Sequence, residues 1–79
     1  MSKLDEKIGR FSAEYGLSPQ QARVFDALAR GALSNEALGR RLAMRQWTLR
    51  KHLDRIAQKT MTRSRAELLY LFYEGRRGV

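Results

Sequence analysis

The spacing of hydrophobic positions predicts helices along the whole chain, and no segment has the two-residue alternation of a strand. Residues 18–31 show the strongest pattern. Ser18 and Gln21 have the spacing of a capping box, with Pro19 at the first helical position, where its missing N–H costs nothing. Gly31 is suited to end this helix. Its apolar face comprises Val24, Phe25 and Leu28.

The next segment, residues 34–42, begins at Ser34 or Asn35, both of which favour the cap position of a helix. The apolar period breaks at residues 43–44, so a longer helix is expected to start at Arg45 or Gln46 and to cover about residues 46–59. The residues of these two helices that are expected to face inward are Leu38, Leu42, Leu49, Leu53 and Ile56.

A second capping box, Ser64 with Glu67, predicts a last helix that ends at Gly75. At the other end of the chain, an apolar stripe at helical spacing comprises Leu4, Ile8, Phe11 and Tyr15. This arm is expected to pack on the body as an extra helix, and the alternative is a short coiled-coil contact with a second subunit. The predicted fold is therefore all-α, with an N-terminal amphipathic arm or helix (1–16), a four-helix domain (17–75) and a basic tail (76–79).

Length and composition narrow the class of protein. A chain of 79 residues has room for one domain with a modest core, and without cysteine it has neither a disulfide framework nor a thiolate metal site. It has no apolar run of 18 residues and no signal peptide, so a soluble, cytoplasmic protein without a membrane partner is expected. No combination of residues indicates catalysis, a cofactor or a metal site, so an enzyme is not expected.

The net charge of +8 comes from one segment of the chain. Residues 40–65 carry nine basic side chains and a single acidic one, Asp54, whereas the remainder is neutral. An evenly spread charge would indicate only a solvated surface, but this concentration favours a face that binds a polyanion.

The second and third helices of the domain have the features of a helix-turn-helix DNA-binding unit. Gly39 lies where the two helices must approach closely, and the small residue Ala43 lies in the turn. If Leu49 marks the inner face, a rotation of 100° per residue puts Trp47, Lys51 and Asp54 on the opposite side. This outward side would lie in the major groove of DNA.

Donor chemistry suggests a role for each outward residue. Arg50 and Lys51 can donate to guanine, the edge of the Trp47 ring suits a thymine methyl group, and Asp54 could accept from cytosine. Asp54 could equally orient Arg50, four residues earlier in the helix. His52 lies near the inner face, where it either packs between helices or contacts a phosphate. Backbone phosphate contacts are predicted for Asn35, Gln46, Thr48, Arg55 and Lys59.

Four stretches in this order resemble the LuxR-type (GerE-type) DNA-binding domain: LSPQQARVFDALARG, LSNEALGRRLA, TLRKHLDRIAQK and RSRAEL. The resemblance covers about residues 17–69. It implies four helices, with the third as recognition helix and the fourth often at a dimer interface. By position it places Arg50, Lys51 and Asp54 at bases and Thr48 and Lys59 at phosphates. The chain departs from the family pattern at Gln21, Ala37 and Arg45, at an extra residue near GALSN, and at residues 60–62.

A homodimer is expected through the last helix, because its consecutive apolar and aromatic residues cover more than one face. These residues are Leu68, Leu69, Tyr70, Leu71, Phe72 and Tyr73.

The sequence thus predicts a stand-alone, dimeric, sequence-specific transcription regulator that binds a two-fold DNA site. It would be of bacterial or phage type, in contact with the nucleoid when bound, and RNA polymerase or a larger regulator is a further conceivable partner. The main alternative is an interaction module that heterodimerises with a larger LuxR-type regulator and antagonises it. A third option is sequence-independent packaging of nucleic acid.

Overall fold

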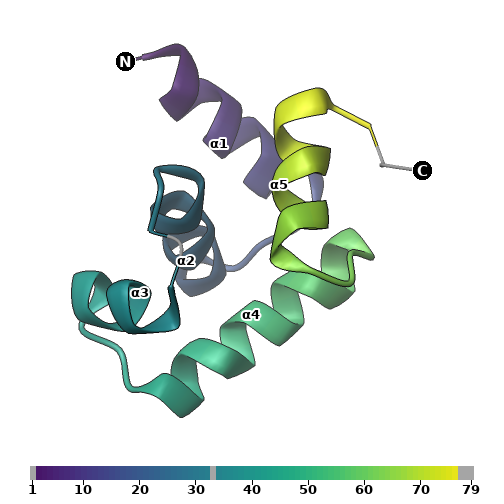
Figure 1. Cartoon of the computed structure of the whole chain (residues 1–79). Helices are drawn as coiled ribbons and strands as arrows, with labels where there is room; N and C mark the ends of the chain where they lie inside the picture. Colours follow the sequence, from purple (N-terminus) through teal and green to yellow (C-terminus); the bar gives the residue numbers. More distant parts are fainter. Residues whose placement is uncertain (1, 33, 77–79) are drawn as a thin grey trace.

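The structure, a computed structural model, describes residues 2–32 and 34–76 (Figure 1). Regular structure in these ranges is entirely helical, which confirms the all-α prediction. The helices are α1 (Lys3–Glu14), α2 (Pro19–Ala29), α3 (Asn35–Leu42), α4 (Gln46–Thr60) and α5 (Arg65–Glu74). Residue 33, in the predicted insertion, and residues 77–79 of the predicted basic tail lie outside the described residues.

The N-terminal segment forms helix α1, which packs on the body as expected. Ile8 and Phe11 of this helix are buried. The Phe11 ring stacks on Phe25 of α2 with the ring centres 4.6 Å apart, and both rings meet Phe72 of α5 edge-on. One core therefore joins α1, α2 and α5, with Leu49 and Ile56 of α4 fully buried in the same cluster.

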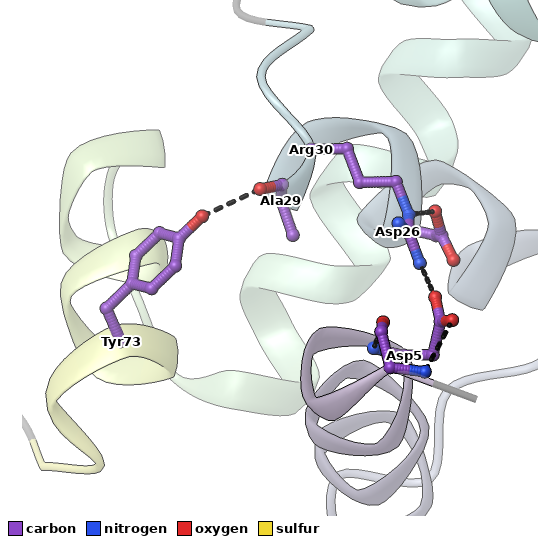
Figure 2. A network of polar contacts seen from close by, with 6 residues as sticks. Asp5, Asp26, Ala29, Arg30 and Tyr73 are labelled. Atoms are coloured by element: carbon purple, nitrogen blue, oxygen red, sulfur yellow. Dashed lines mark hydrogen bonds and ion pairs between the residues drawn. The ribbon is translucent and has the colours of Figure 1, made fainter.

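The C-terminal end of α2 is held by polar contacts from two sides (Figure 2). On one side, Arg30 donates to Asp26 at 2.6 Å and to Asp5 of α1. On the other, the Tyr73 hydroxyl of α5 donates to the Ala29 carbonyl at 2.7 Å. The hydrogen bond from Arg30 lowers the pKa of Asp5, and the same contact raises the pKa of Arg30.

The predicted caps are confirmed in α2 and altered in α5. Ser18 and Gln21 form the complete capping box. In α5 only half of the predicted box forms: the Ser64 hydroxyl accepts from the Glu67 amide, but the Glu67 carboxylate accepts from the Arg63 amide instead of the Ser64 amide.

Among the described residues, no helix combines the length and the apolar character needed to cross a bilayer.

Candidate nucleic-acid interface

Helices α3 and α4 pack closely because Gly39 has no side chain. A Cβ atom at this position would lie 2.5 Å from Gln46 Nε2 and 3.0 Å from the Met44 carbonyl oxygen. Any larger residue would therefore push the turn away from α3. The small residue predicted on the inner face of this helix is confirmed as a packing requirement.

The small residue Ala43 lies in the turn between the two helices, as predicted, and its backbone is left-handed. Ala43 has φ 53° and ψ 44°, and the Met44 amide after it donates to the Gly39 carbonyl at 2.9 Å. Helix α4 then begins at Gln46, with Arg45 as an N-cap that makes no side-chain hydrogen bond to the helix. Helix propensity and packing, rather than a cap, must stabilise this end.

The two faces of α4 differ in exposure, as predicted from a rotation of 100° per residue. Leu49, Ile56 and Thr60 are fully buried, whereas 67% of the Trp47 surface is exposed. The other exposed residues of α4 are Gln46, Arg50, Lys51, Asp54, Arg55, Gln58 and Lys59. Trp47 is thus held outward on a helix whose opposite face is fixed in the core.

The basic residues of positions 40–65 do not all lie on one face. Arg50, Lys51 and Arg55 project from α4, and within the described residues no carboxylate lies within 4.0 Å of them. Arg40 instead pairs with Glu36 on α3 at 2.9 Å. Arg45 is exposed at the start of α4, near Trp47 in the chain. Arg45 was not among the predicted site residues, although an arginine at a cap position that favours Ser, Thr, Asp or Asn indicates a role other than capping.

Lys59, predicted to contact phosphate, is engaged within the protein. Its ammonium donates to the Gly16 carbonyl at 2.9 Å and to Gln21 Oε1 at 2.6 Å. This contact holds the C-terminal end of α4 against the connection between α1 and α2. Lys59 therefore has a structural role that the sequence did not predict, and its phosphate contact stays a prediction.

Asn35 and Gln46 also make contacts between helices. Gln46 Nε2 donates to the Asn35 carbonyl at 3.0 Å, and Asn35 Oδ1 accepts from Arg65 of α5. The first residues of α3, α4 and α5 are thereby joined. The Asn35 Nδ2 group is still a donor that suits a phosphate, whereas Gln46 already uses its own side-chain amide nitrogen.

Asp54 does not orient Arg50 in this structure, since no ion pair within 4.0 Å joins them in the described part of the chain. Instead, Asp54 lies at the edge of a small pocket together with Arg63, Ser64 and Arg65. His52 is partly buried, which agrees with a boundary position between the core and the outer face.

Helix α5 exposes fewer apolar residues than the dimer prediction required. Leu68, Leu71 and Phe72 are buried within the chain, so they cannot form a surface for a partner. Tyr70 and Tyr73 are 41% and 50% exposed, and Leu69 is half-buried. Ala66, which was not predicted, is also exposed on this helix. We call Ala66, Leu69, Tyr70 and Tyr73 the α5 strip.

No group of three or more His, Cys, Asp or Glu side chains in the described residues is placed to hold a metal ion. Comparison of the chain with models of protein families, with curated proteins and with solved structures found no match.

Proposed function

We propose that the chain binds double-stranded DNA in a sequence-specific way, with α4 in the major groove, and regulates transcription as a homodimer. The observation that carries this proposal is the outward face of α4. It presents Trp47, Arg50 and Lys51 to solvent while Leu49 and Ile56 fix the opposite face in the core.

The dimensions of α4 suit this role. A helix of 15 residues is about 22 Å long, and a major groove about 12 Å wide admits one helix. Gly39 lets α3 approach the start of α4 closely, as the first helix of a helix-turn-helix unit does when it crosses the DNA backbone. The resemblance of residues 17–69 to the LuxR-type domain supports the same arrangement.

The residue roles follow from position and donor chemistry. We assign base contacts to Trp47, Arg50 and Lys51, with Asp54 as an acceptor for cytosine N4. Phosphate contacts are assigned to Asn35 through Nδ2, at the start of α3, and to Thr48 and Arg55 of α4. Arg45 joins this group because it is exposed at the first turn of α4.

The α5 strip is the proposed dimer surface. Ala66, Leu69, Tyr70 and Tyr73 have spacings of three, one and three residues, which place them on one side of a helix. A symmetric contact between two such strips would set two recognition helices about one turn of DNA apart, so half-site centres would be about 10 bp apart. The same strip could instead bind a larger LuxR-type regulator, which is the alternative function.

Selection of bound sequences from a pool of random duplexes, at about 150 mM salt, separates these possibilities. A recovered motif with two-fold symmetry supports the proposal. A pool that is retained without any preferred sequence indicates packaging. If no duplex is recovered at this salt concentration, the proposal fails and the antagonist alternative is favoured.

A further inference from the structure

A groove of about 620 Å³ lies between α1 and α2, on residues that the proposed function does not use. On α1 it is lined by Asp5, Ile8, Gly9 and Ser12, which share one side of the helix. A stripe from Pro19 to Arg30 forms the other wall, and Arg41 and Leu42 of α3 complete the lining. This stripe extends over the length of α2, about 16 Å or three helical turns.

The groove is open above an apolar floor. Ile8 and Ala27 on the floor are each only 4% exposed. A Cβ atom placed on Gly9 would have nothing within 4 Å, so the space above this residue is unfilled by the protein. Ser12 Oγ is buried and has no hydrogen-bond partner among the described residues, which is unusual for a hydroxyl in a protein interior.

The charges around the groove are unevenly balanced. Arg30 is paired with both Asp5 and Asp26. Arg23 and Arg41 are exposed, and neither has a carboxylate within 4.0 Å in the described part of the chain. The lining has three arginines and two aspartates, a net charge of +1, and the two arginines without a carboxylate neighbour can pair with carboxylates of an occupant.

We propose that this groove is a docking site for an acidic amphipathic helix of a partner protein. The apolar side of such a helix would cover Ile8, Gly9 and Ala27, and its carboxylates would pair with Arg23 and Arg41. No residue of α4 or α5 lines the groove. The site therefore does not overlap the proposed DNA face of α4 or the α5 strip, and the proposal does not depend on DNA binding.

The test uses the full chain labelled with ¹⁵N and two synthetic helical peptides of about twelve residues. One peptide has leucines on one side and glutamates beside them, and the other has lysines in place of the glutamates. The glutamate peptide is expected to shift the amide resonances of Ile8, Gly9, Ser12 and Ala22 and to bind at least about tenfold more tightly than the lysine peptide.

Two sets of variants locate the binding. Gly9→Leu fills the groove and is expected to weaken the glutamate peptide at least about tenfold, whereas the matched Gly9→Ala keeps the affinity, with both variants equally folded by circular dichroism. The double variant Arg23→Glu, Arg41→Glu is expected to prefer the lysine peptide.

Three results would overturn the proposal. The glutamate peptide could shift only α4 resonances, which would show simple attraction to the basic helix. Gly9→Leu could bind it as the unchanged protein does. The groove resonances of the free protein could move with protein concentration, which would show that a second copy occupies the groove. None of these results depends on whether the chain binds DNA.

Discussion

The Lys59 ammonium donates to the Gln21 side-chain oxygen over 2.6 Å and joins the end of α4 to the start of α2. Lys51, two turns earlier in α4, is exposed, and no carboxylate in the described residues lies within 4.0 Å of it. Two lysines of one helix therefore have different roles, one in holding the fold together and one on the proposed DNA face.

Substitution of each lysine by methionine, which keeps the stem and removes the charge, should separate these roles. Lys59→Met is expected to lower the free energy of unfolding by about 1 kcal/mol, because hydrogen bonds to Gln21 and to the Gly16 carbonyl are lost. Lys51→Met should change the free energy of unfolding by less than about 0.5 kcal/mol and should weaken DNA binding, because a donor to guanine is lost. Urea unfolding measures the stability of both variants, and a titration measures their DNA binding. A Lys59→Met variant as stable as the unchanged protein would contradict the structural role of Lys59.

Gly39→Ala should destabilise the protein by about 1–3 kcal/mol, because the new methyl group would lie too close to the Met44 carbonyl and to Gln46. Gly9→Ala is the matched control. It meets nothing within 4 Å in a helix interior and should stabilise the protein by up to about 1 kcal/mol. Urea unfolding of the two variants provides the comparison, and equal effects would show that α3 and α4 do not pack as described.

The contact between Asp5 and Arg30 should make stability depend on pH. The folded state lowers the pKa of Asp5 below 3.8, so the stabilisation is fully present above that value and is lost as pH falls through the folded pKa. Asp5→Asn should therefore be less stable than the unchanged protein at pH 7, and the difference should shrink below about pH 4. Thermal unfolding of both proteins between pH 7 and about pH 3 measures this difference in stability. In an Arg30→Gln background the difference at pH 7 should be much smaller, and a full difference there would exclude Arg30 as its cause.

Tyr70→Glu should convert the proposed dimer to a monomer, because it places a charge in the centre of the α5 strip. Trp47→Glu is the control, since it places the same charge on a more exposed aromatic residue, on α4, and should leave the dimer intact. Sedimentation equilibrium at tens of micromolar reports the mass of each protein. A monomeric unchanged protein, or a dimeric Tyr70→Glu variant, would contradict the proposed surface.

The sequence predicted the helices and the two faces of α4 because those features depend on residues three and four positions apart. It did not predict the role of Lys59, whose partners Gly16 and Gln21 lie 43 and 38 residues away, one of them through a backbone carbonyl. The inward-facing residues of α5 could not be predicted for a different reason. Six consecutive apolar residues have no periodicity, so only packing could show that Leu68, Leu71 and Phe72 face inward. The groove between α1 and α2 likewise depends on how two helices meet.

The central claim, that the outward face of α4 reads DNA sequence, is tested most directly by selecting duplexes with Arg50→Ala beside the unchanged protein. Arg23→Ala, in the groove between α1 and α2, is the control. The unchanged protein and the control should recover the same two-fold motif, and Arg50→Ala should recover that motif with one position per half-site relaxed by about 1–3 kcal/mol. An unaltered motif for Arg50→Ala, or relaxation in the Arg23→Ala control instead, would contradict the claim.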